Sequence, residues 1–181
     1  MSIYICDASY DDDRPRIDFN CPETRENDWL LIGDVLDGLQ PVSLWPATVV
    51  MKSLPREAIY WDCFMAAGTK GVFSQRFVDV VGKDSLSAFT VLPCQLNFVG
   101  YYFLRCERQI DCFDHAHASY QTFRSNPARI KLIHRFAFHE HLLPHDACFC
   151  IPETKSLLVT EPVAQRIREA GLRGVLLEQI F

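Results

Sequence analysis

The chain has 181 residues, of which 49% are hydrophobic, and a net charge of −5, which suits one globular domain with a single core. It holds no apolar run near the roughly 20 residues that a membrane helix needs, and Met1–Asp7 lacks the basic and apolar regions of a signal peptide. We therefore predict a cytoplasmic protein without membrane contact, whose eight cysteines remain reduced thiols.

The negative charge is concentrated at the start of the chain. Residues 1–40, here called the acidic segment, carry −7 from ten acidic and three basic side chains. Residues 41–181 carry +2 from thirteen acidic and fifteen basic side chains. Nucleic-acid binding depends on Lys and Arg that neutralise phosphates, so we expect no nucleic acid as a ligand.

In the first third of the chain the pattern favours extended structure. Residues 3–6 predict a short strand, and the polar residues 7–16 predict an exposed loop. Two glycines interrupt the apolar pattern of residues 29–39, so we expect strand-like pieces or a bent turn there rather than a helix. Residues 42–51 are expected to be extended, with Pro46 at a sheet edge or an interruption.

The first clear helix signal lies at residues 75–81. Ser74 is a good N-cap, Phe77, Val78 and Val81 form an apolar stripe, and Gly82 follows as a stop.

Strand candidates follow this helix. They are residues 88–92, 95–106 and 129–138, and the second is apolar enough to predict a central strand buried on both faces. The pattern of residues 116–124 leaves both strand and loop open.

The C-terminal part predicts strand, capped helix and strand. Thr160 is a candidate N-cap, Pro162 suits the first turn, and Gly171 suits a left-handed C-cap. Together these elements predict an α+β single domain over residues 1–181. We expect a mixed or mostly antiparallel sheet with a few short helices packed on it.

The units that begin at Ser74 and Thr160 have the same order of elements: strand, Ser or Thr cap, helix, glycine, strand. Internal duplication is one explanation, and it predicts that both helices cover the same sheet from related positions. The other explanation is that this order of elements is simply common.

Residues 106–150, here called the Cys/His segment, contain all six histidines. A metal site is one reading, with His139 and His141 on one face of a strand and further ligands from His145 and Cys148. Solvated or hydrogen-bonded histidines are the other reading, which the spacing favours because it does not match a structural zinc motif. We therefore expect no metal and no other cofactor.

A small metal- or thiol-dependent hydrolase that uses the Cys/His segment is the alternative function. The sequence contains no nucleophile elbow, phosphate loop, dinucleotide fingerprint or zincin motif. We therefore expect no enzymatic activity and assign no catalytic residue.

Several stretches of the chain resemble bacterial immunity proteins of polymorphic toxin systems, most closely immunity family eleven. They are Gly71–Ser74, Tyr101–Leu104, Asp111–Asp114, Phe149–Pro152 and Leu157–Val175. The resemblance covers roughly residues 60–181, and residues 1–59 correspond to the variable, here acidic, start of such proteins. The many Cys and His residues of the Cys/His segment depart from the pattern of that family.

The resemblance implies a non-enzymatic cytoplasmic protein that binds one cognate toxin domain and occludes it, protecting the producing cell. A nuclease with a basic active site would suit the acidic segment, because complementary charge accelerates association. An aromatic residue among acidic neighbours is typical of a protein-binding surface. The candidate partner-binding residues are therefore Asp11, Asp12, Asp13, Asp18, Glu26, Asp28 and Trp29.

Overall fold

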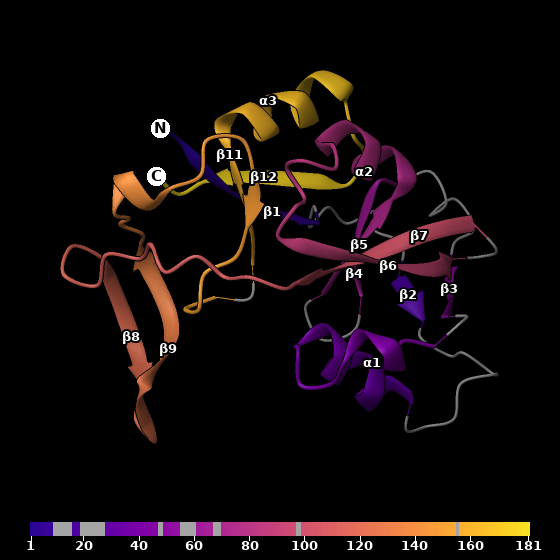
Figure 1. The fold of residues 1–181 in the computed structure, drawn as a ribbon, viewed down its shortest axis with the longest axis horizontal. Coiled ribbons are helices and arrows are strands. Elements are labelled where there is room, and N and C mark those ends of the chain that lie inside the picture. Colours follow the sequence, from indigo (N-terminus) through magenta and orange to yellow (C-terminus); the bar gives the residue numbers. More distant parts are fainter. Residues whose placement is uncertain are drawn as a thin grey trace.

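The computed structural model describes residues 1–8, 16–18, 28–46, 49–54, 61–66, 70–96, 99–154 and 156–181. Within them the strands form two sheets and a separate hairpin (Figure 1). The larger sheet has the order β2 (Arg16–Asp18), β3 (Val50–Leu54), β6 (Phe89–Leu96), β7 (Val99–Cys106), β5 (Lys70–Ser74), β4 (Cys63–Ala66). The smaller sheet has the order β10 (Cys148–Phe149), β11 (Leu157–Thr160), β1 (Ile3–Ala8), β12 (Val175–Gln179).

The remaining regular elements are the hairpin and the helices. The hairpin consists of β8 (Ser119–Phe123) and β9 (Asn126–Arg135), and the α-helices are α1 (Asp28–Leu36), α2 (Gln75–Val81) and α3 (Glu161–Ala170). Short 3-10 turns span Val42–Leu44 and Glu140–Leu142. Paired strands run antiparallel apart from β3 and β6, so the predicted α+β fold with mostly antiparallel sheets is confirmed.

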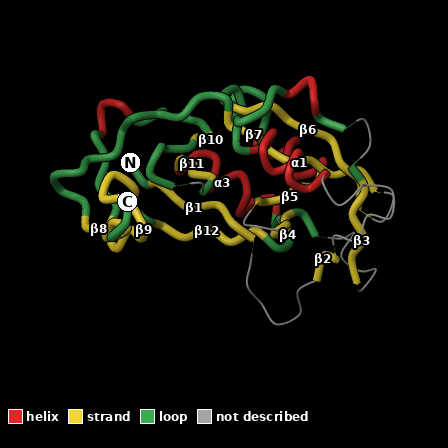
Figure 2. Tube along the Cα trace, turned by 90° about the horizontal axis from the view of Figure 1, so that it is seen from below, coloured by secondary structure: helices red, strands yellow, loops and turns green. Residues whose placement is uncertain are grey.

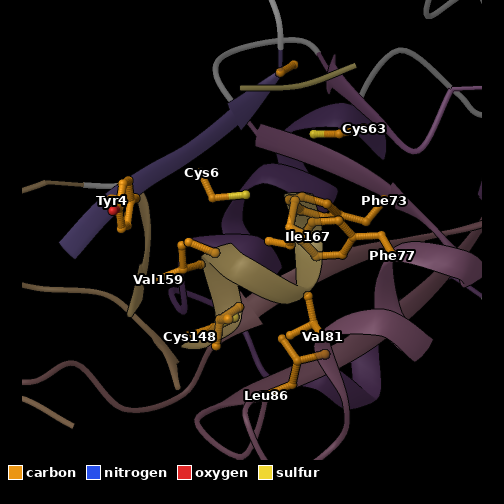
Figure 3. Close-up of a cluster of buried hydrophobic side chains, with 13 residues drawn as sticks. Tyr4, Cys6, Cys63, Phe73, Phe77, Val81, Leu86, Cys148, Val159 and Ile167 are labelled. Atoms are coloured by element: carbon orange, nitrogen blue, oxygen red, sulfur yellow. The ribbon is translucent and has the colours of Figure 1, made fainter. Parts of the chain in front are cut away.

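Side chains that alternate along the strands supply three core clusters. The first lies between α1 and the six-stranded sheet, and it includes Val35, Val72 and Phe103. The second joins both sheets to α2 and α3, with Cys6, Phe73, Phe77 and Ile167 pointing into it (Figure 3). The third lies on the opposite face of the four-stranded sheet and includes Ile3, Phe113 and Leu158. Consecutive residues of β1 therefore serve different clusters, as strand geometry requires.

Both termini belong to the third cluster. Ile180 and Phe181 pack against it, and the Ile3 N–H donates to the Phe181 carbonyl at 3.1 Å. Seen from below, the N- and C-termini lie near the hairpin at one end of the molecule (Figure 2).

Two parts of the chain share one topology. In β5–α2–β6 the strand β7 is inserted antiparallel between the two strands, and in β11–α3–β12 the strand β1 is inserted in the same way. The strands β4 and β10 occupy equivalent outer positions. The prediction that both helices cover one sheet is wrong, because each follows a strand of a different sheet and the two helices contact each other.

The expectation of extended structure at residues 29–39 is wrong, since α1 covers most of this stretch. Ile32, Val35 and Leu36 lie on one helix face and are buried in the first core cluster, while a side chain added at Gly33 would meet nothing within 4 Å. Burial of that face outweighs the roughly 1 kcal/mol that a glycine costs inside a helix.

Residues 42–51 differ from the prediction as well. They begin with a 3-10 turn, and β3 begins only at Val50, so Pro46 precedes the strand.

The other element predictions hold in part. The strands predicted at 88–92 and 95–106 are β6 and β7, but residues 95 and 96 belong to β6, and only Tyr101 and Phe103 of β7 are buried, so the expected burial on both faces is wrong. The helix at 75–81 has the predicted bounds, and the Phe77 N–H donates to the Ser74 hydroxyl at 3.0 Å. The strand β7 is central, with neighbours on both sides, and the open stretch 116–124 contains β8. The strand predicted at 129–138 is β9, which begins earlier and ends at Arg135.

The C-terminal helix is confirmed, including its left-handed C-cap at Gly171 with φ 58°. Thr160 occupies the N-cap position but makes no side-chain cap. Its buried hydroxyl instead accepts a hydrogen bond from the Ala147 N–H at 3.1 Å, which ties α3 to the chain before β10.

Candidate functional site

The structure describes three of the seven predicted partner-binding residues. Asp11, Asp12, Asp13 and Glu26 lie outside the described residues. Asp18 ends the edge strand β2 in register with Lys52, and Asp28 and Trp29 begin α1. The predicted acidic partner-binding site therefore stays a prediction, with one member on the edge strand of the larger sheet and two at the start of α1.

Two histidines of the Cys/His segment, His115 and His117, are exposed and hydrogen-bonded to carboxylates. His117 Nδ1 lies 2.6 Å from Asp114 Oδ2, and His115 Nε2 lies 3.1 Å from Glu153 Oε1. The hydrogen bond from His117 holds the pKa of Asp114 below its ordinary value. This matches the reading of hydrogen-bonded surface histidines.

The four residues of the metal reading do not form a ligand set. His139 precedes a 3-10 turn that contains His141, so the two do not share a strand face, and Cys148 is buried in the second core cluster. Among the residues that the structure describes, no three His, Cys, Asp or Glu side chains are arranged to hold a metal ion.

A pocket of about 600 Å³ is lined by residues of both sheets. Cys6 of β1 and Cys63 of β4 contribute to it, together with Cys106 at the end of β7 and Cys150 just after β10. Four thiols therefore border one cavity. Sequence spacing gave no sign of this, because the four cysteines come from distant parts of the chain.

These thiols differ in ionisation. Burial raises the pKa values of the Cys6 and Cys63 thiols far above the ordinary range, and raises that of nearby Cys148 to about 12. Cys106 is only half-buried, and a hydrogen bond with the Cys150 side chain, assisted by backbone groups of Arg108 and Cys150, lowers its pKa to about 7. A second thiol rather than a histidine base activates Cys106, which does not match the nucleophile–base pair of thiol hydrolases.

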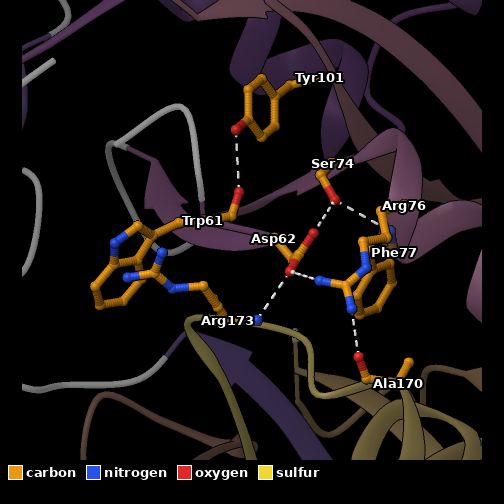
Figure 4. A network of polar contacts seen from close by, with 8 residues as sticks. All are labelled: Trp61, Asp62, Ser74, Arg76, Phe77, Tyr101, Ala170 and Arg173. Atoms are coloured by element: carbon orange, nitrogen blue, oxygen red, sulfur yellow. Dashed lines mark hydrogen bonds and ion pairs between the residues drawn. The ribbon is translucent and has the colours of Figure 1, made fainter. Parts of the chain in front are cut away.

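A buried carboxylate, Asp62, connects the two sheets (Figure 4). Its Oδ1 accepts from the Ser74 hydroxyl at 2.7 Å, and its Oδ2 accepts from the Arg173 N–H at 2.8 Å. Arg76 also reaches Oδ2, at 3.3 Å, and donates to the Ala170 carbonyl at the end of α3. Because its partners are a helix cap, a backbone amide and an arginine, Asp62 serves the fold. The sequence did not single it out.

The hairpin extends away from both sheets, and most of its residues are exposed (Figure 1). Tyr120, Ile130 and Ile133 anchor it to the third core cluster. Leu132, which lies between two of these anchors, is 51% exposed. Phe123, near the tip of the hairpin, is 38% exposed, and the Arg129 guanidinium lies over its ring at 5.5 Å.

The hairpin is also basic. Residues 115–139 contain no acidic side chain and four basic ones, which are Arg124, Arg129, Lys131 and Arg135, all exposed. This run was visible in the sequence, but the near-neutral charge averaged over residues 41–181 concealed it.

Comparison with known proteins adds no assignment: no protein family model matches the chain, and no curated protein is significantly similar to it. Within the described part of the chain, no helix has the length and apolar character needed to cross a membrane.

Proposed function

We propose that this chain is an immunity protein that binds a cognate bacterial toxin domain and neutralises it by occlusion. The proposal is supported by the sequence resemblance to immunity family eleven over roughly residues 60–181. It includes a cytoplasmic location, no cofactor and no catalytic step.

The structural observation behind the proposal is the hairpin, which combines basic side chains with exposed apolar ones. Arginine and aromatic residues contribute much of the binding energy at protein interfaces, and a protruding element can reach into a concave partner. No role in the core explains the exposure of Phe123 near the tip of the hairpin or of Leu132 on β9.

The acidic segment supplies a second contact in this proposal. Its net charge of −7 would steer a partner with a basic active site, such as a nuclease, because complementary charge mainly increases the association rate. The hairpin would then contact an acidic or mixed part of the same partner.

Co-expression tests the proposal. The partner to use is the C-terminal domain of a secreted protein encoded beside this chain. We expect that domain to kill cells when expressed alone, the full chain to restore growth, and the two proteins to co-purify. Failure of the chain to restore growth or to bind the domain would refute the proposal, as would a gene neighbourhood that encodes only metabolic enzymes.

A further inference from the structure

Two thiols that are far apart in the sequence meet on the wall of the pocket. Cys106 ends β7, Cys150 follows β10, and both line the pocket. The Cys106 thiol donates to the Arg108 carbonyl at 3.4 Å, and it lies close enough to the Cys150 side chain for that side chain to lower its pKa. The Ile110 N–H donates to the Cys150 carbonyl at 2.9 Å, which holds the chain after β7 alongside Cys150. Neither residue takes part in a disulfide bond.

Cys106 differs from the buried Cys6, Cys63 and Cys148 in access and ionisation, and its neighbour Cys150 is itself buried. Cys106 is half-buried and borders the cavity, so a small molecule can reach it, whereas Cys6, Cys63 and Cys148 are buried in the second core cluster. With a pKa of about 7, roughly half of Cys106 is thiolate at neutral pH, which is the form that attacks oxidants. The Cys6, Cys63 and Cys148 thiols stay protonated at this pH, because burial raises their pKa values.

We propose that Cys106 and Cys150 are a redox-active pair that forms a disulfide when a hydroperoxide enters the pocket. The Cys106 thiolate attacks the terminal peroxide oxygen, the O–O bond breaks, and the alcohol leaves after taking up a proton. Cys106 is then a sulfenic acid. The Cys150 thiol attacks its sulfur, the S–S bond forms, and water leaves. Overall the two thiols lose two electrons and two protons, and the hydroperoxide is reduced to alcohol and water.

The bond would close the loop that contains the hairpin and all six histidines. It would fasten the base of this loop, where β7 ends, to the segment that follows β10. Cross-linking a long loop restricts the unfolded chain, so we expect the oxidised form to melt about 5–10 °C higher. This inference does not depend on a toxin partner.

The test uses the full chain with Cys21→Ser, which removes the cysteine outside the described residues. The reduced protein is treated with one equivalent of hydrogen peroxide at pH 7.5, blocked with N-ethylmaleimide, and analysed by intact and peptide mass spectrometry. We expect a loss of two hydrogens and one cross-linked peptide pair that joins Cys106 to Cys150. Cys94→Ser, which removes a buried thiol outside the pocket, is the matched control and should still form this cross-link.

Two variants separate the steps. Cys106→Ser should abolish the cross-link, and Cys150→Ser should leave Cys106 as a sulfenic or sulfinic acid. In reduced protein that retains both Cys106 and Cys150, iodoacetamide should modify Cys106 at least tenfold faster than Cys6, Cys63 or Cys148. A cross-link between other cysteines, or labelling of Cys106 no faster than of the buried thiols, would overturn the proposal.

Discussion

Gly174 lets the turn before β12 approach the larger sheet. A Cβ at this position would lie 2.2 Å from the Trp61 ring and 2.6 Å from the Cys63 carbonyl oxygen, and φ is +78°. Gly171 also has a positive φ, of +58°, but nothing lies within 4 Å of its would-be Cβ. A side chain at Gly171 would strain the backbone only, whereas a side chain at Gly174 would strain the backbone and also clash with its neighbours.

We predict that Gly171→Ala lowers the free energy of unfolding by about 1–2 kcal/mol, the cost of left-handed backbone for an alanine. Gly174→Ala should cost about 1–3 kcal/mol more, because the added methyl also overpacks the junction between the sheets. Urea unfolding of both variants measures the difference. Equal losses would show that the close approach at Gly174 contributes nothing.

Asp62 makes a second prediction at this scale. Asp62→Ala leaves the Ser74 hydroxyl and the Arg173 N–H without their acceptor, so we expect the free energy of unfolding to fall by about 2–4 kcal/mol. Asp79 is exposed and accepts a hydrogen bond from Gln75 within α2, so Asp79→Ala is the matched control. It should change the free energy of unfolding by less than about 0.5 kcal/mol. Similar losses in the two variants would contradict the junction role of Asp62.

The ion pair between Asp146 and Arg166 predicts a pH dependence. Arg166 donates to both carboxylate oxygens, at 2.7 and 2.9 Å, and this hydrogen bonding holds the pKa of Asp146 below its ordinary value. The stabilisation is therefore present above the unfolded pKa of about 4 and is lost as pH falls through the lower folded value.

Because the side chains of Arg166 and Asp146 are 34% and 44% exposed, solvent screens the pair. We expect Asp146→Asn to lower the free energy of unfolding by about 0.5–1 kcal/mol at pH 7 and by nothing measurable at pH 2. Denaturation at both pH values checks this. A loss that persists at pH 2 would assign the effect to the neutral hydrogen bond with Ser85 instead.

At the scale of elements, local signals predicted the helices with caps. Ser74 and Gly82 bound α2, and Gly171 ends α3, because cap residues act through their own backbone neighbourhood. The stretch that became β7 was recognisable because it is rich in apolar and aromatic side chains, which are typical of strands.

Elements that depend on distant partners were missed. α1 contains Gly33 and forms because the six-stranded sheet covers its apolar face, which no local pattern reveals. The contact between Cys106 and Cys150 and the bonds of Asp62 join segments that are remote in sequence. The sequence shows which cysteine, histidine and acidic side chains are present, but it does not show which of them meet in the folded chain.

The hairpin carries a prediction of its own. We expect the combined change Arg124→Ser, Arg129→Ser and Lys131→Ser to alter the free energy of unfolding by less than about 0.5 kcal/mol per residue, since all three side chains are exposed. The same variant should weaken toxin binding at least tenfold, and Lys83→Ser, an exposed lysine near α2, should not. Calorimetric titration compares the variants, and unchanged affinity would remove the hairpin from the interface.

On the scale of the whole molecule, the two similar topological units are joined by a shared core. The second core cluster draws on both sheets and both helices, and Arg166 of α3 also donates to the Val81 carbonyl at the end of α2 at 3.0 Å. Such a junction resists separation of the units, so we expect them to unfold together. The rigid body then presents the hairpin at one end.

The negative charge of the whole molecule is concentrated in the acidic segment, and this predicts how charge reversal there affects association. Replacing Asp11, Asp12 and Asp13 by lysine changes the net charge of the acidic segment from −7 to about −1, and should slow association with a basic toxin and flatten its salt dependence. Stopped-flow association at low and physiological salt measures both effects. An unchanged rate at low salt would place the interface elsewhere.

The central claim is that this chain acts by covering a partner rather than by transforming one. The most direct measurement titrates a fixed amount of active toxin with the purified chain and records the remaining toxin activity after different incubation times. Inhibition by occlusion predicts that the toxin activity reaches zero at a fixed molar ratio of chain to toxin. This ratio should not change with incubation time, and both proteins should stay chemically intact. Inactivation of many toxin molecules by one molecule of this chain, or continued activity at saturating concentration, would contradict it.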